Sequence, residues 1–199
     1  MLSYRFMYQL LAAISYLSER RIVHRDLKPQ NVLIDPDSEV LKVTDFGLAR
    51  TITSGSSSDT PGMVTLWYRA PEIMLITPFV YTPSVDLWSA GAIFAEMASG
   101  LPIFQTGWST AWDDTEIGML MKIFRVIGTP TEETWPGFEQ LAHSNPLFPN
   151  FPRSPVLVEE LKHEPHLLDL LDVRPWLDHF VRCVRSRVNS ANLARQYPR

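Results

Sequence analysis

The stretch "IVHRDLKPQN", residues 22–31, decides which fold the rest of the chain is expected to adopt. It places a histidine, an arginine, an aspartate, a lysine and an asparagine within ten positions, and only 21 residues precede it. Side chains of this kind in one short segment look catalytic. The surrounding sequence indicates which elements present them.

The segment before this stretch, residues 4–19, is predicted to form an amphipathic helix. Four of its apolar side chains share one helical face: Phe6, Leu10, Ala13 and Leu17. "RIVH", residues 21–24, then begins a short extended segment. A signal peptide is not favoured, because Gln9 interrupts the apolar run and "SERR" follows where small cleavage residues are expected. No apolar run reaches 18 residues, so we expect no membrane span.

Two β-rich runs follow the polar stretch, "NVLI" at 31–34 and "VLKVTDF" at 40–46. The turn-forming residues "DPDSE" separate them, which predicts a β-hairpin with polar groups at both ends. Residues 51–62, "TITSGSSSDTPG", show no periodicity and are predicted to form a mobile loop whose hydroxyl groups are open to modification.

The remainder of the chain is predicted to be mostly helical. Residues 84–100 are apolar nearly all round, which indicates a buried helix that ends at Gly100. Residues 116–127 have the pattern of an amphipathic helix. Prolines dominate residues 130–165, and a helical pattern returns from residue 166. The expected fold class is mainly α with a small β-hairpin.

Composition limits the possible functions. A chain of 199 residues with 45% hydrophobic and 20% charged residues is typical of one globular domain. A net charge of -4 gives no reason to expect a nucleic-acid partner. Residues 174–199 are the exception, with six arginines against one aspartate, which indicates either a contact surface or a solvated helix face.

Cys183 is the only cysteine in the sequence, so we expect no internal disulfide. We also expect a reducing, intracellular location in the nucleus or cytoplasm.

Four polar residues of the hairpin region, Asp26, Lys28, Asn31 and Asp45, suit metal-assisted phosphoryl transfer. That reaction needs a base to orient the attacking hydroxyl, a cation to balance developing charge and Mg²⁺ on the phosphates. Carboxylate and amide oxygens are hard ligands of the kind that Mg²⁺ prefers.

Three motifs occur in a fixed order: "HRDLKPQN" at 24–31, "DFGLAR" at 45–50 and "TLWYRAPE" at 65–72. Together they resemble the protein kinase signature set, and the third, with "FRVIGTPTEETWPG" at 124–137, is similar to the cyclin-dependent branch. The resemblance implies a kinase-like C-terminal lobe in residues 1–155, without the N-terminal lobe, and a divergent, basic helical tail in residues 156–199.

The resemblance also implies roles for single residues. Asp26 would be the catalytic base, with Lys28 near the transferred phosphate, and Asn31 and Asp45 would hold Mg²⁺. The remaining implied roles concern packing and support. Leu33 would lie under the adenine ring of ATP, and His24 and Phe46 would have packing roles. Asp86 would anchor the backbone of the catalytic loop, which is the stretch of residues 22–31.

Lys28, two residues after Asp26, follows the pattern of the serine/threonine members of the family. Thr60 aligns with the activating phosphothreonine of the cyclin-dependent branch, and Arg25 and Arg50 match two arginines that would bind its phosphate. The implied substrates are proteins with serine or threonine followed by proline. A relative of the mitogen-activated kinases is less favoured, because this loop has Met63 and no tyrosine after Thr60.

The 199 residues contain no GxGxxG motif and no lysine before Lys28. By the resemblance, the glycine-rich loop, the strand lysine and the main cyclin-binding helix all belong to the N-terminal lobe. Because several preorganised groups are missing together, we expect this chain alone to have little or no activity. A cyclin-like partner is doubtful, because the main cyclin-binding helix is missing as well. The alternative is a non-catalytic fragment that binds partners or substrates.

Overall fold

The structure is a computed structural model that describes residues 2–52, 66–75, 81–105, 115–135, 137–138 and 148–152. The chain divides into two compact units, residues 1–119 and 120–199. The described α-helices are α1 (Leu2–Glu19), α2 (Pro71–Leu75), α3 (Pro83–Ser99) and α4 (Glu116–Ile127). The described strands are β1 (Ile22–Val23), β2 (Val32–Asp35), β3 (Val40–Val43) and β4 (Arg50–Thr51). Short 3₁₀ turns occur at η1 (Pro29–Asn31), η2 (Phe46–Leu48) and η3 (Leu66–Tyr68).

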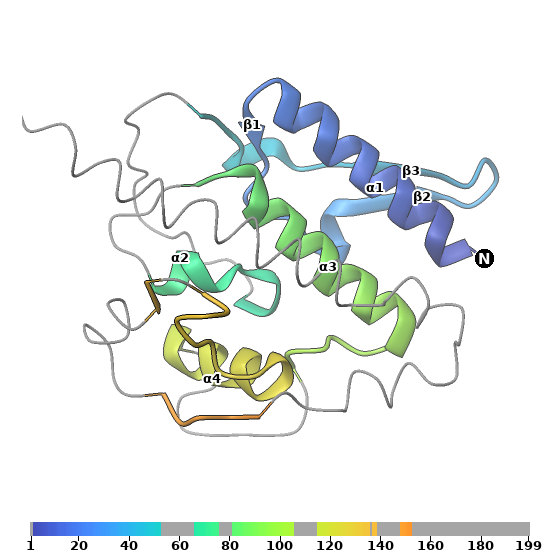
Figure 1. Cartoon of the computed structure of the whole chain (residues 1–199). Coiled ribbons are helices and arrows are strands. Elements are labelled where there is room, and N and C mark those ends of the chain that lie inside the picture. Colours follow the sequence, from blue (N-terminus) through green and yellow to red (C-terminus); the bar gives the residue numbers. More distant parts are fainter. Residues whose placement is uncertain are drawn as a thin grey trace, which may run out of the picture. The chain divides into compact units, whose positions relative to one another are not determined.

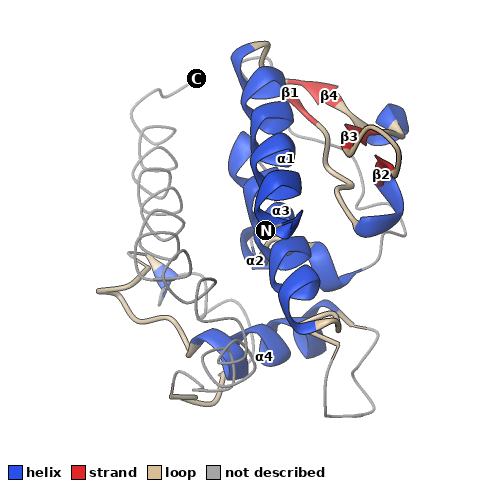
Figure 2. Cartoon of the chain, turned by 90° about the vertical axis from the view of Figure 1, so that its right-hand side faces the viewer, coloured by secondary structure: helices blue, strands red, loops and turns tan. Residues whose placement is uncertain are grey.

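The predicted N-terminal helix is confirmed as α1, which packs against α3 and β3 (Figures 1 and 2). Phe6, Leu10 and Leu17 of the predicted apolar face are buried. Ala13 is only half-buried, and Ile14 is buried in addition. The buried stripe therefore keeps the i, i+4, i+8 spacing from Phe6 through Leu10 to Ile14.

The predicted central helix is confirmed as α3, and Figure 1 shows it in green beside α1. Pro83 occupies its first turn, where the missing backbone N–H has no helical partner to lose. Gly100 ends it with φ 78°, and its N–H donates to the carbonyl oxygen of Glu96 at 2.8 Å. The predicted bounds of α4, residues 116–127, also match the structure.

Replacement of Gly100 by alanine is expected to lower the free energy of unfolding by about 1–2 kcal/mol, because an L-residue is strained at positive φ. An added Cβ would meet nothing within 4 Å, so the cost is conformational and not steric. Gly91→Ala is the matched control, since Gly91 lies inside α3 and its Cβ would also meet nothing within 4 Å. Urea denaturation of the full chain measures both variants, and equal stability of the two would contradict the argument.

The predicted β-hairpin is confirmed as the antiparallel pair β2–β3, with a register that runs from Val32 opposite Val43 to Asp35 opposite Val40. A second sheet was not predicted. In it β1 pairs with β4, so that Ile22 lies opposite Thr51. Thr51 was expected in the mobile loop 51–62 and is instead in a strand, whereas residues 53–62 lie outside the described residues.

Unit 2 has a small aromatic cluster around Phe124, which is completely buried. The ring centroid of Phe124 lies 5.7 Å from that of Phe138 and 5.1 Å from that of Phe148, both in edge-to-face geometry.

The helix predicted from residue 166 lies outside the described residues. The domain boundary expected at residue 155 stays a prediction for the same reason. Among the described helices, none is both long and apolar enough to cross a membrane.

Candidate active site

The loop between β1 and η1 is held to α3 by one buried carboxylate. Oδ2 of Asp86 accepts the backbone N–H of His24 at 2.8 Å, and Oδ1 accepts that of Arg25 at 2.9 Å. Asp86 is 1% exposed, and this burial raises the pKa of its carboxyl group, while the two N–H bonds act in the opposite direction. The anchoring role predicted for Asp86 is confirmed. Arg25, whose N–H this carboxylate binds, has φ 71°, a conformation that a non-glycine residue seldom adopts.

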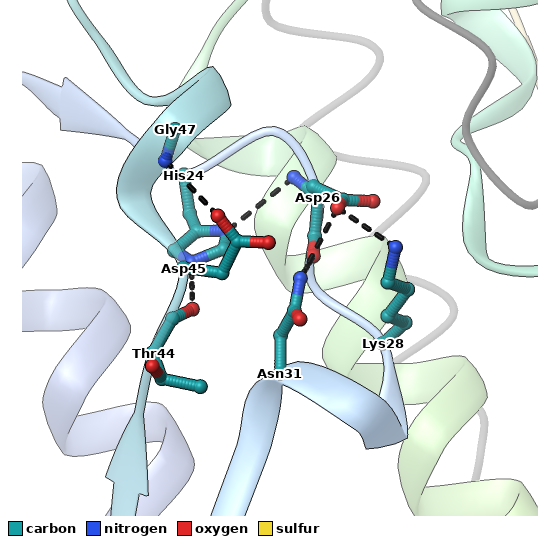
Figure 3. A network of polar contacts seen from close by, with 7 residues as sticks. All are labelled: His24, Asp26, Lys28, Asn31, Thr44, Asp45 and Gly47. Atoms are coloured by element: carbon teal, nitrogen blue, oxygen red, sulfur yellow. Dashed lines mark hydrogen bonds and ion pairs between the residues drawn. The ribbon is translucent and has the colours of Figure 1, made fainter.

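The anchored loop presents three interacting side chains, drawn in Figure 3. Nζ of Lys28 lies 2.9 Å from Oδ2 of Asp26. Nδ2 of Asn31 donates to the carbonyl oxygen of Asp26 at 2.8 Å and to its Oδ2 at 3.1 Å. Oδ1 of Asp26 is buried and has no hydrogen-bond partner within the described residues. Asp26 therefore has one oxygen held in place by two side chains and one oxygen whose hydrogen-bonding capacity is unused among the described residues.

His24 connects this loop to the segment that follows β3. Its ring is completely buried, and Nε2 lies 2.9 Å from the carbonyl oxygen of Thr44. Because a carbonyl only accepts, Nε2 carries the proton, and Nδ1 accepts the backbone N–H of Asp26 at 3.3 Å. The ring centroid of His24 also lies 4.8 Å from that of Phe46. The packing role predicted for His24 is thus confirmed. Phe46 contacts the His24 ring but is 47% exposed, so it packs on one side only.

Asp45 follows Thr44 at the open end of the hairpin, where the Thr44 N–H donates to the carbonyl oxygen of Asn31 at 2.9 Å. This bond brings Asn31 next to the segment that carries Asp45. Oδ1 of Asp45 accepts the Gly47 N–H at 3.3 Å, and a Cβ on Gly47 would lie only 3.1 Å from this oxygen. Glycine at position 47 therefore permits the close approach that holds the carboxylate.

The donor set fits Mg²⁺. Both hydrogen bonds of the Asn31 amide use Nδ2, which leaves its carbonyl oxygen as a metal ligand, and Asp45 supplies a carboxylate. Mg²⁺ keeps several waters and takes one or two carboxylates together with phosphate oxygens. No group of three or more His, Cys, Asp or Glu able to hold a metal occurs among the described residues, so a Mg²⁺ site here would rely on phosphate and water for its other ligands.

Arg25 and Arg50 lie near each other, as the predicted phosphate-binding role requires. Burial lowers the pKa of the Arg25 guanidinium, and the positive charge of Arg50 adds to this effect. Nε of Arg25 donates to the carbonyl oxygen of Leu48 at 2.6 Å, and its guanidinium lies 4.7 Å from the ring centroid of Tyr81. Thr60 lies outside the described residues, so its proposed phosphorylation stays a prediction.

Leu33, the residue expected under adenine, is 56% exposed on β2. Phe46 is also exposed beside the site. The structure therefore leaves apolar surface at this position, and the adenine role of Leu33 stays a prediction.

Sequence reasoning missed two contacts of the "WYRAPE" segment with α3. The hydroxyl of Tyr68 donates to Oε2 of Glu96 at 2.6 Å, and the hydroxyl of Ser89 donates to the carbonyl oxygen of Tyr68 at 2.7 Å. Burial raises the pKa of the Tyr68 hydroxyl, and the bond to Glu96 raises it further. Glu96 was the available signal, since it is a carboxylate in the mostly apolar C-terminal half of α3.

Together, the buried Asp26 carboxylate, the adjacent Lys28 ammonium and the oxygen donors of Asn31 and Asp45 are groups of the kind that metal-assisted phosphoryl transfer uses. A family model described as "Protein kinase domain" matches residues 3–184, so the chain belongs to the protein kinase family. Its sequence is also 48% identical over 155 residues to Cyclin-dependent kinase 2 of Caenorhabditis elegans. That match includes 78% of this chain and 40% of the relative, so the chain spans about two fifths of the relative's length. The predicted likeness to cyclin-dependent kinases is confirmed.

Proposed function

We propose that these residues form the C-terminal lobe of a serine/threonine protein kinase of cyclin-dependent type. The kinase would transfer the γ-phosphate of ATP to serine or threonine followed by proline in protein substrates. The observation that carries the proposal is the Asp26 carboxylate, held by Lys28 and Asn31 through Oδ2 while Oδ1 has no hydrogen-bond partner among the described residues.

The roles follow from the geometry. Oδ1 of Asp26 accepts the proton of the substrate hydroxyl, while the bonds to Oδ2 keep the carboxylate oriented. The Lys28 ammonium lies at this carboxylate and can approach the negative charge that develops on the transferred phosphate. Asn31 and Asp45 would hold Mg²⁺, which when bound neutralises charge on the phosphate oxygens.

Regulation by phosphorylation is proposed for the same site. Arg25 lies in the catalytic loop and Arg50 follows η2, so a phosphate bound by both would connect the two segments. The neighbouring positive charges of these arginines support an anionic ligand there. Thr60 is the residue that we propose to carry the phosphate.

A cyclin partner is named for the C. elegans relative, which is a cyclin-dependent kinase. In this family the main cyclin-binding helix belongs to the N-terminal lobe. We therefore do not expect the 199 residues alone to bind a cyclin tightly.

The 199-residue chain, tested alone, is expected to transfer phosphate to a Ser-Pro peptide at least about 10²-fold more slowly than the C. elegans relative. The reason is that it has no GxGxxG motif and no lysine before Lys28 to hold the phosphates, and one lost preorganised donor alone typically lowers a rate by about 10²–10³. Calorimetry with Mg·ATP and transfer of labelled phosphate provide the measurements. A comparable rate that disappears in Asp26→Asn would refute the inactivity and support the kinase proposal. A Ser-Ala peptide controls for the preference for proline.

A non-catalytic binding role is the second candidate, and the exposed apolar side chains beside the site favour it: Leu33, Ile34 and Phe46. Exposed apolar surface is typical of contact sites for partners. Absence of any Mg·ATP binding by the chain would support this second role over the first.

A further inference from the structure

Gln9 in α1, which the sequence marks only as an interruption of an apolar run, makes two hydrogen bonds to β3 and its preceding residue. Nε2 donates to the carbonyl oxygen of Glu39 at 3.0 Å, and Oε1 accepts the backbone N–H of Leu41 at 2.8 Å. The side chain of Arg5, one helical turn earlier, pairs with the carboxylate of Glu39. These hydrogen bonds and this ion pair connect helix α1 to the turn end of the β2–β3 hairpin. Figure 1 shows the hairpin running past the N-terminal half of α1.

The Gln9 amide takes the place of a neighbouring strand. The N–H of Leu41 and the carbonyl of Glu39 are the two backbone groups that an adjacent strand would bind on the edge of β3 opposite to β2. One primary amide satisfies both, since it contains one donor and one acceptor group in the same plane. A carboxylate or an apolar side chain of the same length cannot do so.

Strand β3 connects this contact directly to the candidate metal ligands. The strand ends at Val43, and Thr44 then donates to the carbonyl oxygen of Asn31 while its own carbonyl binds His24. Asp45 is the next residue. The β2–β3 ladder contains only four residue pairs, so its turn end and its open end lie only three residues apart along β3.

We propose that Gln9 is a positioning residue, which holds the hairpin on α1 and thereby sets where Asn31 and Asp45 lie relative to Asp26. This inference rests on the metal-binding role that the proposed function gives to Asn31 and Asp45. Gln9 itself touches neither metal nor nucleotide. Its effect passes through the backbone of β3.

Gln9→Met tests the proposal in the full chain, because methionine keeps the length and removes both hydrogen bonds. Native-state hydrogen exchange by NMR is expected to become at least about fivefold faster at Leu41 and at Thr44, the factor that corresponds to one ordinary net hydrogen bond. Exchange at Ile93, buried in α3, should stay within about twofold. Tyr8→Met is the matched control, since Tyr8 precedes Gln9 and is 75% exposed. Unchanged exchange at Thr44, or equally faster exchange at Ile93, would overturn the proposal.

A second experiment tests whether Gln9 affects the proposed metal ligands, and it does not require activity. Mn²⁺ is added together with ATP, and its binding is detected by paramagnetic broadening of the NMR signal of the Asp45 amide. Gln9→Met is expected to weaken Mn²⁺ binding by about 3–10-fold, less than the 10–100-fold typical of a residue bonded directly to a ligand. Asp45→Ala identifies the site. If Asp45→Ala leaves Mn²⁺ binding unchanged, the proposed metal site is refuted, and the ligand-positioning role of Gln9 is refuted with it. Hydrogen exchange at Thr44 still reports, independently, whether Gln9 orders the hairpin.

Discussion

Asp26→Asn is expected to lower phosphate transfer by about 10²–10⁴-fold, the range typical of a lost general base. The variant keeps the shape of the side chain, and its amide oxygen can still accept from Lys28 or Asn31. It removes the basic oxygen that, as Oδ1 of Asp26, has no hydrogen-bond partner among the described residues. The initial rate on a Ser-Pro peptide at saturating ATP measures the effect. The assay uses a chimera in which the N-terminal lobe of the C. elegans kinase precedes these residues, so that the wild-type rate is measurable.

Mg·ATP affinity of the chimera should change little in Asp26→Asn, because Asn31 and Asp45, and not Asp26, are the proposed metal ligands. Asp37→Asn, in the exposed hairpin turn, is the matched control and should leave the rate unchanged. A rate for Asp26→Asn within about tenfold of wild type would exclude Asp26 as the base.

Asp86→Ala is expected to lower the free energy of unfolding by about 2–6 kcal/mol. It leaves the backbone N–H groups of His24 and Arg25 without their acceptor, and each such group that is buried costs about 1–3 kcal/mol. Chemical denaturation of the full chain measures the loss. The same variant should also release Arg25 from its positive φ, which NMR chemical shifts of the loop would report.

Asp86→Asn distinguishes lost hydrogen bonding from lost volume, since asparagine retains the shape and one acceptor oxygen. Its stability should fall between those of wild type and Asp86→Ala. Asp37→Ala provides the surface control, with an expected change within about 0.5 kcal/mol. A loss for Asp86→Ala below about 1 kcal/mol would show that the loop does not depend on this anchor.

The helices could be predicted from the sequence because each depends on local signals. The period of Phe6 and Leu10 identifies α1, and Gly100 identifies the end of α3. The β1–β4 pairing could not be predicted, since each strand has two residues and no turn joins them. Such a pairing is set by how the chain packs in three dimensions and leaves no periodic pattern.

The candidate site was predicted through motifs, and the structure brings Asp26, Lys28 and Asn31 together as those motifs require. The supporting contacts left no signal in a single sequence. Gln9 and Glu39 are ordinary surface residue types, 30 positions apart, and only the packing of α1 on β3 makes them partners. Long-range hydrogen bonds of this kind have no periodicity by which a sequence can be searched.

The bonds from Asp86 to His24 and Arg25 have a consequence for the order of folding. They join residues 62 and 61 positions apart, so the catalytic loop acquires its backbone conformation only when α3 is in place. Contacts of such sequence separation form after the entropy of closing a long loop has been overcome. During synthesis the catalytic loop leaves the ribosome well before the carboxylate that shapes it. The nascent chain therefore carries Asp26, Lys28 and Asn31 for several seconds before Asp86 is available to shape the loop that presents them.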